Sequence, residues 1–217
     1  MPKIVTQKKV LLLLSEGFEM IEASGFTDVF AWASFQEDVS ISVTSAAIHP
    51  AVKAAFGGLS ITSLQLLNDV ELHDYDALAI PGGMEWAGFF EDAYSTTFKN
   101  TIKHFVDQKK PIAAVCVASL SLAHAGGLTG RKAAIYHSAK GKHKVSLEDH
   151  GAVFVDRPIV KDGNITTSSG PGTSLEVALS LLADLVDAQA VSTTRIMMRA
   201  PLPSAQWYEP QVPVISG

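Results

Sequence analysis

Cys116 is the only cysteine of the 217-residue chain, and it stands where an apolar run gives way to a helical pattern. The run at residues 112–115 is typical of a buried parallel strand, and Leu120 and His124 then recur at helical spacing. A thiol on such a turn lies beneath the free N–H groups of the helix, which favour negative charge. The pattern predicts either a nucleophilic thiol that ionises more readily than in water or a small side chain that closes a core strand.

Glu22 lies on an apolar face of the helix expected at residues 18–35. At about 100° per residue, this face also carries Phe26, Val29, Phe30 and Ala33. A carboxyl group that enters the core has a raised pKa unless a cation pairs with it. Glu22 is therefore either a protonated carboxyl that points inward or a charged one in a frayed first turn, stabilised outside by the helix dipole.

The same helix has a second apolar face, formed by Ile21, Trp32 and Phe35. One helix does not need two apolar faces to cover a single sheet. We therefore expect one face to meet the domain core and the other to meet a partner subunit, which predicts a homodimer through the first helix.

Three features follow directly after predicted strands: Gly82-Gly83, Cys116 and His137. Parallel sheets bind ligands beyond the carboxyl ends of their strands, so these residues are expected to lie together. The backbone N–H groups of Gly83 and Val117 are candidates for an oxyanion hole. His137 either orients the thiol and exchanges protons or is simply hydrogen-bonded to the backbone.

The elements that must position these residues alternate between strand and helix patterns. We expect strands at residues 9–14, 39–46, 76–80, 112–115, 132–136, 152–155, 159–161 and 165–168, and a hairpin from 52–56 and 59–63. We expect helices at residues 18–35, 93–108 and 174–186, another after Cys116, and a helix or loop at 139–150. This alternation implies one α/β domain with a mostly parallel central sheet and helices on both faces, a core at about 8–190 and a surface tail at 200–217.

Composition narrows the functional classes. A net charge of −5 argues against binding to nucleic acid, and a single cysteine excludes an internal disulfide and a cysteine-based zinc site. The histidines lack the spacing of metal ligands, and the Lys-rich segment at 140–144 is typical of a solvated face. No segment is long enough to span a bilayer. We expect a cytoplasmic protein with neither metal nor cofactor and no membrane partner.

Several motifs together carry a family resemblance. They are EGFEMIEASGFTDVF at 16–30, AIPGG at 79–83, AAVCVAS at 113–119, SGPGTSLEVAL at 169–179 and RAPL at 199–202. With them the chain resembles the DJ-1/PfpI (ThiJ) family, and within it the DJ-1 branch. The resemblance implies a flavodoxin-like sandwich, a homodimer partly through the first helix, and a nucleophilic or redox-sensitive Cys116 bonded to a protonated Glu22. It also implies an oxyanion hole from Gly83 and Val117.

The chain departs from family patterns in four places. Val117 stands where PfpI proteases typically carry histidine, which weakens a protease assignment. No histidine is followed by glutamate two residues later, as class I glutamine amidotransferases require. Ser169 replaces an arginine common in the DJ-1 branch, so an anion contact near the cysteine is expected to be missing. Gly25-Phe26 replaces the usual apolar residue and proline, so the helix need not pack identically.

Two functions fit these observations. In the first, a glyoxalase III-type or deglycase-type enzyme acts on a small aldehyde or a glycated substrate. The Cys116 thiolate adds to the aldehyde, Glu22 moves a proton between two carbons, and water releases the product. In the second, a stress sensor or chaperone with little turnover, Cys116 oxidises to a sulfinate that Glu22 stabilises. We favour the enzyme because His137 is available and Ser169 weakens the anion site.

Overall fold

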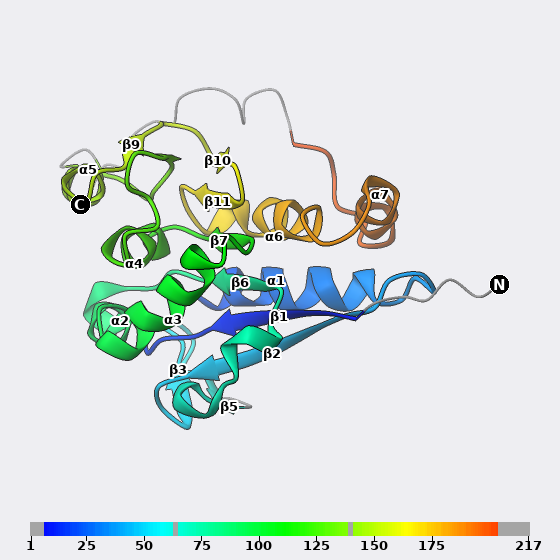
Figure 1. Cartoon of the computed structure of the whole chain (residues 1–217), viewed down its shortest axis with the longest axis horizontal. Helices are drawn as coiled ribbons and strands as arrows, with labels where there is room; N and C mark the ends of the chain where they lie inside the picture. Colours follow the sequence, from blue (N-terminus) through cyan, green and yellow to red (C-terminus); the bar gives the residue numbers. More distant parts are fainter. Residues whose placement is uncertain (1–6, 63–64, 139–140, 204–217) are drawn as a thin grey trace.

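A seven-stranded sheet with strand order β10-β11-β7-β6-β1-β2-β5 runs through the middle of the molecule (Figure 1). The computed structural model describes residues 7–62, 65–138 and 141–203. The strands of this sheet are β1 (Lys8–Leu13), β2 (Ile41–Ala47), β5 (Gln65–Leu66), β6 (Ala77–Ile80), β7 (Ile112–Ala114), β10 (Ile159–Asp162) and β11 (Ile165–Ser168). Neighbouring strands are parallel, except that β10 and β11 form an antiparallel hairpin.

Helices cover the sheet on both sides. Helices α1 (Met20–Ala33), α6 (Ser174–Leu182) and α7 (Ala188–Met197) pack together, and α2 (Phe89–Ala93), α3 (Thr96–Asp107) and α4 (Ala118–His124) form a second group. Helix α5 (Lys142–Asp149) packs against α4 and the short strand β9 (Val153–Phe154). The predicted mostly parallel, flavodoxin-like α/β sandwich is therefore confirmed.

Some predicted elements differ from the observed ones. The predicted hairpin is present as β3 (Ala51–Lys53) and β4 (Ser60–Thr62). The strand expected at 132–136 is only β8 (Lys132–Ala133), which pairs with β9 in a separate small sheet. The strand ends there because the N–H of Ala134 donates to the side-chain oxygen Oγ1 of Thr167 at 2.9 Å and not to the backbone of a neighbouring strand.

Helix α7 was not predicted, and the helix expected at 174–186 ends at Leu182. Asp187 caps α7 by accepting a hydrogen bond from the N–H of Ala190 at 2.9 Å. Gln36, just after α1, donates to the carbonyl of Ala190 and to Thr194 Oγ1. Most of the expected tail at 200–217 lies outside the described residues, as do positions 63, 139 and 140.

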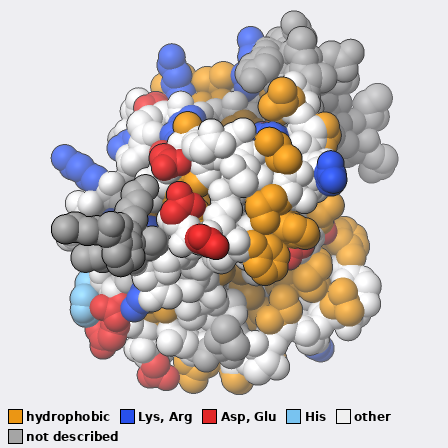
Figure 2. Space-filling model, turned by 90° about the vertical axis from the view of Figure 1, so that its right-hand side faces the viewer, with side chains coloured by type: hydrophobic (Ala, Val, Ile, Leu, Met, Phe, Trp, Pro, Cys, Tyr) orange, Lys and Arg blue, Asp and Glu red, His pale blue; other side chains and the backbone are white. Residues whose placement is uncertain are grey.

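The second apolar face of α1 is exposed to solvent. Ile21, Trp32 and Phe35 are 54%, 38% and 69% exposed, and the rings of Trp32 and Phe35 meet edge to face at 5.5 Å. Figure 2 views the molecule from the side on which α1 ends. Hydrophobic side chains gather on part of the molecular surface that faces the viewer there. The inward face is buried as expected, so the two faces of α1 have different environments.

Candidate active site

Cys116 lies on the sharp turn between β7 and α4. Its φ of 59° is in the left-handed region, which costs about 1–3 kcal/mol for a residue other than glycine. The turn is held because the N–H of Cys116 donates to the carbonyl of Ser168 at 3.1 Å. A residue with positive φ on a sharp turn from a strand into a helix has the geometry of a nucleophile elbow, and the Val117 N–H donates to its sulfur.

Glu22 points inward from the first turn of α1 and is completely buried. Its Oε2 accepts a hydrogen bond of 2.6 Å from the N–H of Gly82, the second residue after β6. A Cβ atom at position 82 would lie 2.8 Å from the carbonyl oxygen of Val115 and 3.0 Å from Glu22 Oε2. Glycine is therefore needed for the end of β6 to approach the carboxyl group this closely.

The carboxyl group of Glu22 is protonated at neutral pH. Its pKa is raised from 4.5 to about 8, chiefly by burial and to a smaller extent by the charge of Glu19, while hydrogen bonds from the Gly82 N–H and the Cys116 thiol oppose the shift. Because Oε2 accepts from Gly82, the proton belongs on Oε1. That oxygen has no well-aligned partner among the described residues, and the Cys116 thiol is the neighbouring side chain with which the carboxyl interacts. The O–H of Glu22 is thus available to the sulfur or to a substrate.

The thiol does not ionise as readily as the sequence suggested. Cys116 is only 7% exposed, and burial raises its pKa, with a smaller contribution from the charge on Glu22. The Val117 N–H lowers the pKa of the thiol but does not outweigh burial. The expectation of a readily ionised thiol is therefore wrong for the free protein. Thiol and carboxyl titrate as a pair, and the first proton leaves this pair near pH 8.

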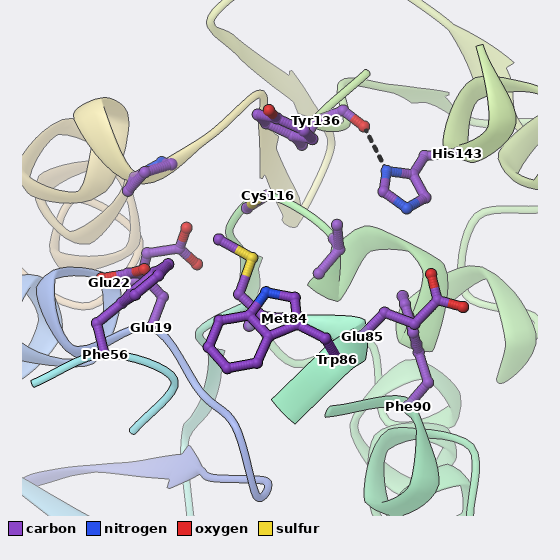
Figure 3. Close-up of a pocket in the computed structure, with 13 residues that line it drawn as sticks. Glu19, Glu22, Phe56, Met84, Glu85, Trp86, Phe90, Cys116, Tyr136 and His143 are labelled. Carbon is purple, nitrogen blue, oxygen red and sulfur yellow. Dashed lines mark hydrogen bonds between the residues drawn. The ribbon is translucent and has the colours of Figure 1, made fainter. Parts of the chain in front are cut away.

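A pocket of about 390 Å³ opens onto this pair (Figure 3). Its lining comprises Glu19, Glu22, Phe56, Gly83, Met84, Glu85, Trp86, Phe90, Cys116, Val117, Tyr136, His143 and Pro171. The N–H of Gly83 has no hydrogen-bond partner among the described residues, so it is free to bind a carbonyl oxygen. A Cβ at Gly83 would lie 2.3 Å from the carbonyl oxygen of Gly17, so only glycine fits there. The pocket thus joins Cys116, Glu22, Gly83 and Val117, as the sequence predicts.

Of the two histidines near the site, the structure places His143 in the pocket lining and His137 outside it. His137 is buried outside the lining of this pocket, where its ring meets that of Phe154 at 5.1 Å and its Nε2 lies 3.7 Å from Asp156. His143, which the sequence placed on a solvated face, lines the pocket instead. His143 lies in the first turn of α5, and its Nδ1 is 3.1 Å from the carbonyl oxygen of Tyr136, a contact that no residue pattern in the sequence indicates.

Ser169 is not part of the pocket lining, and its N–H donates to the carbonyl of Pro158 at 2.9 Å. Among the described lining residues there is neither lysine nor arginine, whereas Glu19 and Glu85 add carboxylates. The described part of the chain contains no cluster of three or more histidine, cysteine or acidic residues suited to a metal ion. In the same residues, no helix is long and apolar enough to cross a membrane.

Known proteins resemble the chain over most of its length. A model of the DJ-1/PfpI family matches residues 8–184. Protein DJ-1 homolog B of Arabidopsis thaliana is 30% identical over 175 residues, which are 80% of this chain but only 37% of the plant protein. The Parkinson disease protein 7 homolog of Danio rerio is 28% identical over 195 residues, 90% of this chain and 96% of that protein.

The fold comparison agrees with the sequence comparison. The crystal structure of Drosophila melanogaster DJ-1beta matches with a TM-score of 0.79 at 27% identity, covering 91% of this chain and 100% of that chain. The elements that hold Cys116, Glu22 and Gly83 all lie within the matched family region, residues 8–184.

Proposed function

Since this chain belongs to the DJ-1/PfpI family, we propose that it is a cofactor-independent enzyme of the glyoxalase III type, which converts 2-oxoaldehydes such as methylglyoxal to 2-hydroxy acids. The observation that carries this proposal is the protonated Glu22 beside Cys116 at one end of a pocket. A nucleophile and a proton carrier there line the same space as the backbone of Gly83 and Val117. Deglycation of glycated substrates would use the same first step.

The first step is addition of the thiol across the aldehyde. A bond forms between sulfur and the aldehyde carbon while Glu22 gives its Oε1 proton to the carbonyl oxygen and takes the thiol proton. The N–H groups of Gly83 and Val117 stabilise the charge that develops on this oxygen. Proton relay by Glu22 removes the need for a preformed thiolate, which burial disfavours.

The second step moves a proton between the two carbons. With sulfur now bound to carbon, Glu22 releases to solvent the proton that it took from the thiol. Its carboxylate then removes the hydrogen from the former aldehyde carbon and delivers it to the adjacent keto carbon, while the proton of the hemithioacetal hydroxyl passes to the former keto oxygen. The product is a thioester of the 2-hydroxy acid on Cys116. Hydrolysis of that thioester by water then releases the acid and restores the thiol.

A redox sensor is the second candidate, because the Glu22 O–H and the Val117 N–H that contact the sulfur would also bind a sulfinate. The charges of the pocket favour the enzyme. A sulfinate is permanently anionic, and the described lining offers the carboxylates of Glu19 and Glu85 but no cation. An aldehyde is neutral, so these carboxylates do not oppose its binding.

The proposal is tested by incubating purified protein with methylglyoxal and no added thiol, and by identifying the product with NMR. We expect lactate from the wild type and none above background from Cys116→Ser. If the wild type forms no lactate and instead gains two oxygen atoms on Cys116 with hydrogen peroxide, the sensor replaces the enzyme.

We expect kcat/KM to rise with pH and reach a plateau above about pH 8. The pKa of Glu22 is about 8 in the free protein, and the carbon-to-carbon transfer needs its carboxylate, whose fraction increases up to that pH. Initial rates of lactate formation between pH 6 and pH 9 at constant ionic strength would show this rise of kcat/KM and its plateau. A flat or falling profile over this range would remove Glu22 as the base.

We also propose a homodimer through the face formed by Ile21, Trp32 and Phe35. This face is apolar, exposed and not needed by the core. Light scattering at micromolar concentration should give about twice the mass of the chain, and Trp32→Glu should reduce it by placing a charge in the interface. Ile196→Glu on α7, another exposed apolar position, serves as the control. A wild type that is monomeric under these conditions contradicts the interface.

A further inference from the structure

Large apolar side chains make up much of the pocket lining around the Cys116 and Glu22 pair. They are Phe56, Met84, Trp86, Phe90 and Tyr136. In Figure 3, Tyr136 lies on one side of Cys116, while Met84, Trp86 and Phe56 lie on the other. A volume of about 390 Å³ falls within the range of sites that hold drug-sized ligands. The methyl group of methylglyoxal would leave most of this space unfilled.

Two of these aromatic side chains are unusually exposed. Trp86 is 69% and Phe56 50% exposed, and their rings meet edge to face with centroids 5.7 Å apart. They come from separate segments, Trp86 after β6 and Phe56 between β3 and β4. A planar substituent that enters the pocket would cover both rings and remove apolar surface from water.

The charges at the site favour a neutral substituent. Glu19 and Glu85 line the pocket, and Lys142 Nζ donates to Glu85 Oε2 at 2.8 Å. A substrate with a carboxylate or phosphate would meet these charges without a lysine or arginine among the described lining residues. The pocket therefore selects against anionic carbonyl compounds.

Building on the proposed function, we infer that the preferred substrates are 2-oxoaldehydes whose second carbon bears an aromatic or similarly large uncharged hydrocarbon group. Cys116 and Glu22 act on the two carbonyl carbons, and the substituent lies against Trp86 and Phe56. Phenylglyoxal is the simplest probe of this class, and its product would be mandelate.

The test compares kcat/KM for phenylglyoxal and methylglyoxal. We expect phenylglyoxal to be favoured by at least ~10-fold, the usual scale for filling an apolar pocket. Trp86→Ala should reduce this ratio several-fold, whereas Ile196→Ala, an exposed apolar residue on α7, should leave it unchanged. Cys116→Ser gives the background with each aldehyde. A ratio of one or less, or a ratio unaffected by Trp86→Ala, overturns the inference. If the wild type converts neither aldehyde to its 2-hydroxy acid, the proposed function itself is overturned.

A different observation concerns His143. Its Nδ1 lies 3.1 Å from the carbonyl oxygen of Tyr136, which can only accept, so Nδ1 carries the hydrogen and Nε2 has a free lone pair (Figure 3). The ring is half-buried near the rings of Phe90 and Tyr136. Burial and the charge of Lys142 lower the pKa of His143, while its bond to Tyr136 and the charge of Glu85 oppose this. The imidazole is neutral and able to accept a proton.

The geometry points to His143 as the general base that activates water against the Cys116 thioester. As the water oxygen bonds to the thioester carbon, one water proton passes to Nε2. The intermediate then collapses, the carbon–sulfur bond breaks, and the imidazolium returns the proton to the departing sulfur. The acid leaves and the thiol is restored.

His143→Gln should separate this step from the earlier ones. We expect kcat to fall by about 100-fold while a 2-hydroxyacyl group accumulates on Cys116, detected by intact-protein mass spectrometry under turnover. His150→Ala is the control, because His150 is an exposed histidine at the other end of α5. This variant should not accumulate the acyl group. Turnover unchanged in His143→Gln, or loss of turnover without the acyl group, excludes this role. Both results presuppose lactate formation by the wild type, whose absence would instead count against the enzyme.

Discussion

Glu22→Gln is expected to make the folded protein more stable at neutral pH, by about 3 kcal/mol at pH 7. The pKa of Glu22 rises from 4.5 to about 8 on folding because the carboxyl group is buried. The folded state therefore holds this proton more tightly than the unfolded state. The stabilisation of the folded state by this bound proton is complete below pH 4.5 and is lost as the pH rises toward 8. Glutamine keeps an acceptor for Gly82 and never needs to ionise.

Chemical denaturation of both proteins between pH 4 and pH 9 measures this difference. It should be negligible below about pH 4.5 and grow by about 1.4 kcal/mol per pH unit up to pH 8. Glu37→Gln, on an exposed site just beyond α1, should show no such growth. A Glu22→Gln protein that is less stable than the wild type throughout would mean that Glu22 is charged and paired in the folded state.

The same substitution should abolish most turnover. Glu22→Gln keeps a hydrogen-bond donor but cannot relay a proton, and Glu22→Ala removes both functions. We expect each variant to lose at least ~100-fold in kcat/KM for methylglyoxal, the usual scale for a general acid–base residue. If Glu22→Gln is more stable than the wild type at neutral pH, as expected above, its loss of turnover does not come from unfolding.

The two variants also separate the enzyme from the sensor. For a sensor, Glu22→Gln should preserve sulfinate formation on Cys116 after peroxide treatment, Glu22→Ala should not, and turnover should be negligible in every form. Glu37→Gln is again the control for both assays. Wild-type turnover that survives in Glu22→Gln would contradict the proposed proton transfer and would assign it to another group or to solvent.

Sequence patterns were sufficient to predict the positions of Cys116 and Glu22 at the centre of the site. The junction of an apolar strand with a helix placed Cys116 on its turn, and helical periodicity placed Glu22 on the buried face of α1. Both signals are local, since they need only the register of one element. The burial that raises the pKa of the Cys116 thiol is not local, because it depends on what the rest of the fold packs around the sulfur. The sequence therefore predicted the position of this thiol but not its protonation.

Residues brought together by long-range packing could not be predicted. His143 lies in a Lys-rich stretch that looks solvated, and it lines the pocket because the first turn of α5 lies beside the backbone of Tyr136. Half of the ten residues of helix α7 are weak helix formers, namely one valine, one serine, two threonines and one isoleucine. Its stability comes from distant partners, since Gln36 bonds to two of its residues and Arg195 pairs with Glu176 of α6.

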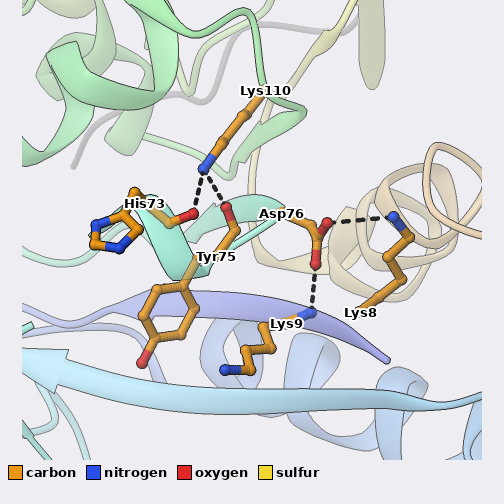
Figure 4. A network of polar contacts seen from close by, with 6 residues as sticks. All are labelled: Lys8, Lys9, His73, Tyr75, Asp76 and Lys110. Carbon is orange, nitrogen blue, oxygen red and sulfur yellow. Dashed lines mark hydrogen bonds and ion pairs between the residues drawn. The ribbon is translucent and has the colours of Figure 1, made fainter. Parts of the chain in front are cut away.

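Long-range polar contacts also join the amino-terminal ends of the central strands β1, β6 and β7, opposite the ends that carry Cys116 and Gly82 (Figure 4). Asp76, just before β6, accepts a 2.8 Å hydrogen bond from the N–H of Lys9 in β1. Lys110, near the start of β7, donates to the carbonyl oxygens of His73 and Tyr75. In the sequence these lysines and the aspartate look like ordinary surface charges, so their structural role appears only once the strands are paired.

The proposed chemistry is tested most directly by trapping its first intermediate. Glu22→Gln is incubated with methylglyoxal and analysed by native intact-protein mass spectrometry, with lactate measured in the same sample. Because a thiol adds reversibly to an aldehyde without a proton carrier, only more slowly, whereas the next proton transfer needs Glu22, we predict one methylglyoxal adduct on Cys116 and almost no lactate. Lactate at the wild-type rate, or an adduct that forms equally in Cys116→Ser, would contradict the account.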